Sequence, residues 1–305
     1  MDKKRFRGIF PALYACYDDK GEVSGERTKN LCRHLFNKGI LGFYVGGSSG
    51  ECIYQSLDER KNTLRYVKES FGEDEKPTLI AHVGAPSTRD SARLAKYAEE
   101  LGYDAVAAIP PIYFKMPESA IYKYWIEIVE ASSLPFIMYN IPQTTGYSLS
   151  IDMFIKMASL EKVIGIKNSS LPAMDIERFK NIGGEGFIVY NGPDEQYISG
   201  RVIGADGGIG GTYGVMPELF LRAEKLVSSG DFFNARKIQN DINNVIFALF
   251  ALQGNMYSGI KNILKLKGLN IGDVRGPMEQ IHGEDFKTIE KIKDSIDLTI
   301  AKWAF

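Results

Sequence analysis

The feature that most constrains the fold of this chain is a regular alternation of two kinds of segment. Short runs of apolar, β-branched or aromatic residues are each followed by a stretch whose apolar residues recur at helical spacing. The apolar runs begin near Gly8, Gly42, Thr78, Ala105, Pro135, Val163, Phe187 and Gly207. The helical stretches are expected to begin near Ser24, Leu57, Ser87, Glu118, Ser150, Pro172, Glu195 and Pro217.

The apolar runs lack the polar alternation of strands that have one face in water. The segments Thr78–Val83 and Pro135–Tyr139 are almost continuously apolar, which is typical of parallel strands buried on both faces. Eight strand–helix units in about 225 residues match an α/β fold of the closed (β/α)8 type, the TIM barrel. An open doubly wound sheet is the alternative, but it usually contains fewer units. We therefore predict a (β/α)8 barrel.

The alternation ends near residue 228, and from there to Phe305 the sequence predicts helices only. These helices are expected over residues 232–251, 257–267 and 285–303, with Gly268 and Pro277 between them. No Pro- or Ser-rich linker separates the two parts. We expect a barrel over residues 1–227 and a C-terminal helical segment over residues 228–305 that packs on it.

Composition excludes several classes of partner. Lys and Arg number 37 and Asp and Glu 38, so the net charge of −1 argues against a broad nucleic-acid surface or an anionic membrane. Apolar residues make up 44% of the chain, as in ordinary globular proteins, but no apolar run is long enough to span a bilayer. We expect a small-molecule partner, with no nucleic acid and no membrane.

The N-terminus superficially resembles a short export signal, because basic residues precede an apolar stretch over residues 8–17. Pro11 interrupts this stretch, which runs directly into a turn at Asp18–Gly21, so a first buried strand is the better interpretation. The three cysteines, Cys16, Cys32 and Cys52, are too few and too unevenly placed for a disulfide framework. These features favour the reducing cytoplasm.

Two strand-end residues are candidates for chemistry, because active sites of such barrels form at the carboxyl ends of the strands. Lys167 ends the apolar run Val163–Ile166, and burial there disfavours a charged ammonium. A neutral amine can attack a ketone and form a Schiff base. Tyr139 ends the preceding run, so we expect its phenol within reach of Lys167, where a phenol can transfer protons. Position alone leaves an alternative open for each residue. Lys167 would then reach solvent or pair with a carboxylate, and Tyr139 would only fill the core.

The second run ends in Gly46–Glu51, which combines the hydroxyls of Ser48 and Ser49 with accessible backbone. Amide N–H groups beside glycines can hold an anion such as a carboxylate, although a plain tight turn is the alternative. The same string matches the Gly-x-Ser-x-Gly elbow of serine hydrolases, with Ser48 as nucleophile. That interpretation needs a downstream acid and then a histidine; only His82 and His282 lie downstream, and we expect neither to end a strand beside the elbow.

The sequence gives little support for a phosphate, dinucleotide or metal site. The cluster Gly207–Gly211 resembles a phosphate loop, but it holds no Lys or Arg, so glycines that relieve crowding at barrel closure are the better interpretation. No stretch matches the dinucleotide pattern Gly-x-Gly-x-x-Gly. His34, His82 and His282 have no partner at metal-ligand spacing. We expect neither a cofactor nor a metal.

Taken together, these strand ends resemble the family of pyruvate-dependent class I aldolases that contains N-acetylneuraminate lyase and dihydrodipicolinate synthase. Three segments carry the resemblance, in order and at barrel spacing: Gly46–Glu51, Tyr139–Pro142 and Gly165–Lys167. The resemblance covers essentially the whole chain, including the helical tail. It implies that Lys167 forms a Schiff base with the keto carbon of the substrate and that Tyr139 transfers protons.

The resemblance also implies roles for residues outside this pair. Gly47, Ser48 and Ser49, through hydroxyls and backbone amides, would hold the pyruvyl carboxylate. Tyr113 matches a catalytic-site tyrosine that reaches into the site of a neighbouring subunit, which implies a homotetramer built as a dimer of dimers.

Two features favour the branch of the family that cleaves sialic acid. Dihydrodipicolinate synthases typically place an arginine at the position of Thr144, where it binds the carboxylate of their second substrate. The segments Tyr190–Glu195 and Gly204–Gly210 resemble those of the sialic-acid lyases, in which the tail hydroxyls of the sugar donate hydrogen bonds. The substrate-binding residues implied in this way are Gly192, Asp194, Glu195, Gly210, Gly211 and, beside the reacting hydroxyl, Ser169.

Two departures from the lyase pattern concern hydroxyl groups. The lyases often carry Ser at the position of Gly211 and Thr at that of Ser49, and the loss at Gly211 weakens the case for full recognition of the sugar tail. The resemblance implies reversible cleavage of N-acetylneuraminate to N-acetylmannosamine and pyruvate. The alternatives are another 2-keto-3-deoxy sugar acid, dihydrodipicolinate synthesis, and a ligand-sensing protein without catalysis. Intact Lys167, Tyr139 and both serines argue against the last.

Overall fold

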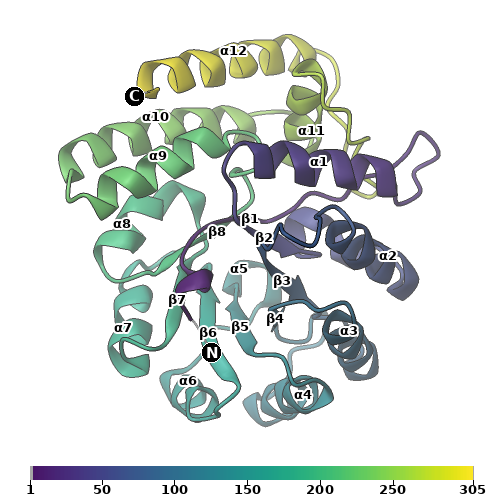
Figure 1. Cartoon of the computed structure of the whole chain (residues 1–305), viewed down its shortest axis with the longest axis vertical. Helices are drawn as coiled ribbons and strands as arrows, with labels where there is room; N and C mark the ends of the chain where they lie inside the picture. The colour runs from purple at the N-terminus through teal and green to yellow at the C-terminus, as the bar shows by residue number, and fades with distance from the viewer. Residues whose placement is uncertain (1–2, 305) are drawn as a thin grey trace.

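The computed structural model describes residues 3–304, and its centre is a barrel of eight parallel strands (Figure 1). The strands pair in the order β1-β8-β7-β6-β5-β4-β3-β2, and a parallel bridge from Ala12 to Tyr44 joins the two ends of this series. The barrel prediction is therefore confirmed. The strands are β1 (Gly8–Pro11), β2 (Gly42–Val45), β3 (Thr78–His82), β4 (Ala105–Ala108), β5 (Phe136–Asn140), β6 (Val163–Asn168), β7 (Ile188–Asn191) and β8 (Gly207–Gly210).

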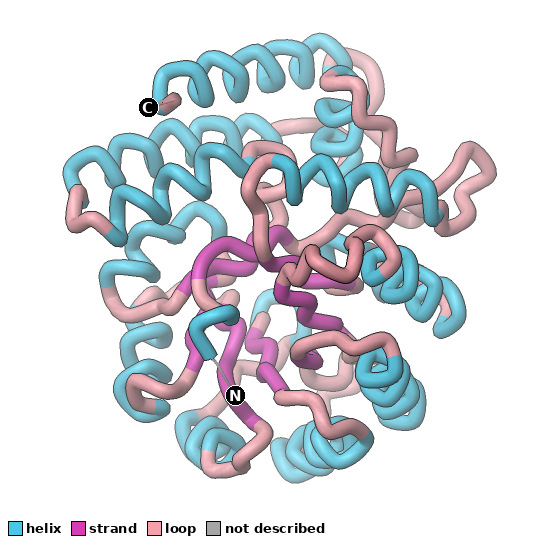
Figure 2. The backbone as a smooth tube through the Cα atoms, viewed as in Figure 1, coloured by secondary structure: helices cyan, strands magenta, loops and turns pink. Residues whose placement is uncertain are grey.

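Helices between the strands form a surrounding layer, as Figure 2 shows. Serine caps start several of them: the Ser24, Ser87 and Ser150 side chains each accept a backbone N–H, and Ser56 forms a capping box with Glu59. These helices are α1 (Gly25–Asn37), α2 (Leu57–Lys68), α3 (Thr88–Glu100), α4 (Glu118–Ala131), α5 (Pro142–Thr145), α6 (Ile151–Ala158), α7 (Met174–Gly183), α8 (Tyr197–Val202) and α9 (Pro217–Ser228).

Apolar side chains form two cores, one inside the barrel and one between the strands and the helices. The inner core contains Phe10, Ile80, Ile137 and Tyr190, all of them buried. Every residue of β3 and β5 is buried, which explains why these strands read as continuous apolar runs. Buried polar side chains such as Asn140, Lys167 and Asn191 lie at the carboxyl ends of the strands.

The glycines of β8 relieve crowding where the barrel closes. A Cβ on Gly207 would lie 2.2 Å from the carbonyl oxygen of Gly8 on the neighbouring strand β1. A Cβ on Gly208 would lie 2.3 Å from the Tyr213 hydroxyl oxygen. Both distances are far below any normal contact, so the crowding interpretation of this cluster holds.

The C-terminal segment consists of α10 (Phe232–Phe250), α11 (Met256–Leu266) and α12 (Asp285–Trp303). Helix α10 packs on α9 and on the turn after β7, while α12 lies outermost against α9, α10 and α11 (Figure 1). The division at residues 227 and 228 stays a prediction, although α9 ends at Ser228. Within residues 3–304, no helix has the length and apolarity needed to cross a membrane.

Candidate active site

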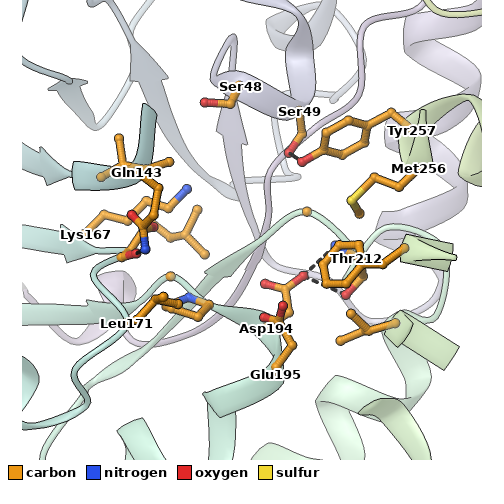
Figure 3. Close-up of a pocket in the computed structure, with 18 of the residues that line it drawn as sticks. Ser48, Ser49, Gln143, Lys167, Leu171, Asp194, Glu195, Thr212, Met256 and Tyr257 are labelled. Carbon is orange, nitrogen blue, oxygen red and sulfur yellow. Dashed lines mark hydrogen bonds between the residues drawn. The ribbon is translucent and has the colours of Figure 1, made fainter. Parts of the chain in front are cut away.

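A cavity of about 260 Å³ opens at the carboxyl ends of the strands (Figure 3). It brings together most of the residues that the sequence predicted for a site. Those that line it are Ser48, Ser49, Tyr139, Lys167, Ser169, Gly192, Asp194, Glu195 and Gly211. They come from the ends of β2, β5, β6, β7 and β8, so the barrel geometry assembles them from distant parts of the chain.

Lys167 lies at the wall of this cavity with only 5% of its surface exposed. Its Nζ atom lies 4.1 Å from the centre of the Tyr139 ring and 4.8 Å from that of the Tyr44 ring. Within residues 3–304, no carboxylate lies within ion-pair distance of this amine. Lys167 is therefore neither exposed to solvent nor paired with a carboxylate. Its amine is free to react with a molecule in the cavity.

Tyr139 is fixed beside Lys167 by strand register, since the two residues are direct partners in the β5–β6 pair. Its ring packs edge-on against Tyr44 and His82, with centroids 6.0 Å apart in both cases. Its hydroxyl has no hydrogen-bond partner within the described part of the chain. The ring is thus held rigidly while the phenol group stays available to a molecule in the cavity.

The loop after β2 presents hydroxyl and amide groups to the cavity. Ser48 to Gly50 form a 3-10 turn, and across residues 3–304 the backbone N–H groups of Ser48 and Ser49 have no backbone acceptor. Ser48 is exposed, whereas Ser49 is buried and its Oγ lies 2.9 Å from the Tyr257 hydroxyl oxygen. The loop therefore offers hydrogen-bond donors suited to a carboxylate.

Glu51 anchors this loop to the C-terminal segment. It has a left-handed backbone with φ of 53°, and its carboxylate accepts hydrogen bonds from Lys261 Nζ at 2.7 Å and from the Arg275 backbone N–H at 2.8 Å. Both side chains of the Glu51–Lys261 ion pair are completely buried. The position of Ser48 and Ser49 is thus fixed from outside the barrel.

Asp194 supplies an acceptor on the opposite wall. Its Oδ2 accepts hydrogen bonds from the Thr212 backbone N–H at 2.7 Å and from the Thr212 hydroxyl at 2.6 Å. Its Oδ1 is buried and has no partner within residues 3–304. Glu195 lies beside it on the same 3-10 turn (Figure 3). An unfilled carboxylate oxygen in a cavity is a natural acceptor for a ligand hydroxyl.

Helix α10 holds this acidic turn in place from behind. The Gln239 side chain donates to the Asp194 carbonyl oxygen, and the Asn243 side chain donates to the Glu195 carbonyl oxygen, both at 3.2 Å. Gly192, just before the turn, has no room for a side chain, because a Cβ there would lie 2.0 Å from Ser169 Oγ. The polar wall of the cavity is therefore built by the barrel and the C-terminal segment together.

Asp194 makes stability depend on pH. Burial raises the pKa of this carboxyl to about 6 from an ordinary 3.8. Between these values the folded chain keeps a proton that the unfolded chain has lost, so the free energy of unfolding falls as pH rises through this window. Asp194→Asn should remove that contribution, on the order of 2 kcal/mol. Urea unfolding of both proteins at about pH 4.5 and 7.5 measures it; a pH-independent difference between them would contradict it.

Three predicted site residues do not line the cavity. Gly47 and Gly210 lie next to residues that do, but are not part of the wall. Tyr113 is 92% exposed, has a φ of 84° and stacks edge-on against Phe114. Its predicted reach into a neighbouring subunit stays a prediction.

The expectation about His82 was wrong, although the serine hydrolase interpretation still fails. His82 does end β3, the strand that pairs with β2, and its Nδ1 lies 2.9 Å from the Gly46 carbonyl oxygen. Its Nε2 accepts the Ile109 backbone N–H, so both ring nitrogens are engaged with backbone. Burial lowers the pKa of this imidazole to about 3. His82 therefore has no acceptor left to activate Ser48.

Elsewhere in the described residues, the structure offers no second site with the same reactive groups. A second cavity of about 500 Å³ adjoins the other side of the Ser48 loop and contains the buried Arg60, but neither Lys167 nor Tyr139 reaches it. Within residues 3–304, no group of three or more His, Cys, Asp or Glu is placed to hold a metal ion. The smaller cavity is therefore the candidate active site.

Sequence reasoning missed the part of the wall that comes from the C-terminal segment. Ile246 and Phe250 of α10 and Met256 and Tyr257 at the start of α11 all line the cavity. Ser49 and Tyr257 are 208 positions apart, so no local pattern could pair them. Also missed, though nearer to predicted residues, were Ile141, Gln143, Leu171, Pro193, Ile209 and Thr212.

Comparisons with known proteins identify the family of this chain. The model of the dihydrodipicolinate synthetase family matches residues 5–295. The N-acetylneuraminate lyase of Mediterraneibacter gnavus is 47% identical over 96% of this chain and 93% of its own length, and that of Rhizobium meliloti is 34% identical over 94% of each chain. The wild-type sialic acid aldolase structure from Ruminococcus gnavus has a TM-score of 0.96 at 46% identity, covering 98% of this chain and 99% of that one. The family expected from the sequence is confirmed: this chain belongs to the dihydrodipicolinate synthetase family.

Proposed function

We propose that this chain is a Schiff-base aldolase that reversibly cleaves N-acetylneuraminate to N-acetylmannosamine and pyruvate. The observation that carries the proposal is the buried amine of Lys167, which has no carboxylate partner and lies against the ring of Tyr139 in the cavity. The relatives named as N-acetylneuraminate lyases, with nearly full coverage, support this substrate.

The reaction begins when Lys167 Nζ attacks the keto carbon of the open-chain sugar acid and water leaves, which forms a protonated imine. Tyr139 relays the proton of the hydroxyl on the second carbon from the imine carbon: its oxygen accepts that proton while its own hydrogen passes to water. The bond that breaks joins this hydroxyl-bearing carbon to the carbon next to the imine. The electrons of that bond flow into the imine and give an enamine, while N-acetylmannosamine departs as an aldehyde. Protonation of the enamine carbon and hydrolysis of the imine release pyruvate and restore the amine.

The two polar walls suit the two ends of this substrate. The Ser48–Ser49 loop supplies donors for the carboxylate next to the keto carbon. On the other wall, Asp194 Oδ1 and the Glu195 carboxylate accept hydrogen bonds from the hydroxyls of the sugar tail. Ser169, which also lines the cavity, is proposed to contact the reacting hydroxyl.

Tyr139→Phe separates imine formation from bond cleavage. The variant should still form the imine with pyruvate, because Lys167 is intact, but its kcat for sialic acid should fall by about 10²–10⁴-fold without the phenol proton. Borohydride reduction followed by mass measurement reports the imine, and pyruvate release coupled to lactate dehydrogenase reports turnover. Undiminished cleavage by this variant would remove Tyr139 from the proposed role.

The same coupled assay distinguishes the alternatives. Thr144 lies on α5, carries no charge and does not line the cavity, which disfavours the dihydrodipicolinate synthase reaction. Faster turnover of an unbranched 2-keto-3-deoxy sugar acid than of N-acetylneuraminate would reassign the substrate. Sugar binding without any pyruvate release would identify a ligand-sensing protein.

The assembly belongs to the proposal as well. Tyr113 and Phe114 together expose an aromatic surface on the loop after β4, with 92% and 68% of their side chains accessible. Such a surface is typical of a subunit contact and supports the expected homotetramer. A cytoplasmic location remains part of the same expectation.

A further inference from the structure

We propose that Tyr257 is a positioning residue for substrate binding: its phenol holds the Ser49 hydroxyl so that Ser49 donates to the substrate carboxylate, and Gly211 lacks a side chain to make room for this phenol. The proposal rests on the proposed function and assigns a role in it to the C-terminal segment. No local feature of the sequence connects these residues.

The contact between the two hydroxyls is direct and inside the cavity. Tyr257 Oη lies 2.9 Å from Ser49 Oγ, and Figure 3 shows the Tyr257 ring pointing toward Ser49. The backbone of Tyr257 is fixed at the start of α11, where the Asn255 side chain caps its N–H at 2.9 Å. The ring also packs at 6.2 Å from the ring of Tyr14. The phenol therefore approaches Ser49 from a rigid support.

Either hydroxyl could donate in this contact, but a substrate carboxylate only accepts hydrogen bonds, so the phenol must donate if the Ser49 hydrogen is to be free for the substrate. Burial raises the pKa of the phenol, and the nearby Asp194 carboxylate raises it further, so Tyr257 stays protonated and can donate. When the phenol donates to Ser49 Oγ, the serine's own hydrogen is free to turn toward the cavity. A hydroxyl that is oriented before the substrate arrives costs less entropy on binding than one that rotates freely.

Gly211 completes the arrangement. A Cβ at this position would lie 2.7 Å from Tyr257 Oη and 3.1 Å from Ser49 Oγ. The glycine cannot withdraw easily, because Tyr14 Oη donates to its carbonyl oxygen at 2.6 Å. A side chain at residue 211 and a phenol at residue 257 therefore compete for one space. A serine at 211 would bring its own hydroxyl next to Ser49, so either residue can supply the same hydrogen bond, but not both.

Tyr257→Phe tests the first part. Half-saturation by pyruvate in borohydride trapping, and KM for N-acetylneuraminate, should both rise by about 3- to 10-fold, the value of one hydrogen bond, with a smaller change in kcat. Tyr147→Phe is the matched control, because Tyr147 donates a similar bond to Glu118 at 2.6 Å outside the cavity, and it should change neither value. Unchanged half-saturation in Tyr257→Phe would overturn the proposal.

Two double variants separate positioning from a merely structural role. In a Ser49→Ala background, Tyr257→Phe should add no further loss, because the hydroxyl it positions is gone. Gly211→Ser alone should weaken pyruvate binding through the clash, whereas Gly211→Ser with Tyr257→Phe should return half-saturation to within about 2-fold of wild type. Additive losses in either pair would overturn the proposal. A wild-type protein that releases no pyruvate would instead refute the proposed function.

Discussion

Replacing Lys167 with methionine is expected to abolish both sialic acid cleavage and the pyruvate adduct. Turnover should fall by at least about 10⁴-fold, because every proposed step passes through an imine on this nitrogen. Stability should not fall, since methionine fills a similar volume and Lys167 makes no ion pair within residues 3–304. Pyruvate release in the coupled assay and intact mass after borohydride reduction measure the two losses.

Lys162→Met is the matched control for this experiment. Lys162 precedes the opposite end of β6, and its Nζ donates to the carbonyl oxygens of Val129 and Ser132, far from the cavity wall. This variant should keep both adduct and turnover. An adduct that persists in Lys167→Met would mean that another amine carries the chemistry, and the mechanism would then be wrong.

Removing the other buried lysine should affect stability instead. Lys261→Met is expected to lower the free energy of unfolding by about 3–5 kcal/mol, because Glu51 would remain as an unpaired buried charge. Both side chains of this pair are completely enclosed, so water cannot replace the lost ammonium. Equilibrium unfolding in urea measures the change. Binding of pyruvate should weaken as well, since Glu51 directly follows the Ser48–Gly50 turn.

The partner of the pair supplies the internal control. Adding Glu51→Gln to Lys261→Met removes the stranded charge and should recover a large part of the lost stability. The exposed pair of Lys287 and Glu284 offers a contrast, because Lys287→Met should leave unfolding unchanged. A loss in Lys261→Met no larger than in Lys287→Met would show that the buried pair does not hold the loop.

The strands were predictable because the barrel buries both of their faces. Continuous apolar runs then mark each strand: β1, β2, β3, β4, β6 and β8 begin at the expected residues, and β5 and β7 begin one residue later. Serine caps marked several helix starts in the same way. Helix α5 was missed because its four residues are too few to establish a helical period. The start of α8 was placed early because a 3-10 turn over Asp194–Gln196 precedes it.

From the sequence alone, only the site residues that lie at the ends of strands could be predicted. Lys167 and Tyr139 could be paired from the alternation alone, since neighbouring parallel strands end at the same rim. Asp194 and Glu195 needed the family resemblance, because acidic residues in a turn carry no distinctive pattern. The sequence did not reveal the residues that support the site, namely Tyr257, Lys261 and the side-chain amides of α10. These residues contact the ends of the strands only after the whole chain has folded.

The docking of α10 and α11 sets an order in time for synthesis of this protein. A nascent chain that has left the ribosome only as far as residue 227 holds every strand and the reactive lysine, but neither the phenol behind Ser49 nor the cation that neutralises Glu51. The chain can therefore become active only late, when about the last quarter of the polypeptide emerges and α10 and α11 pack over the ends of the strands.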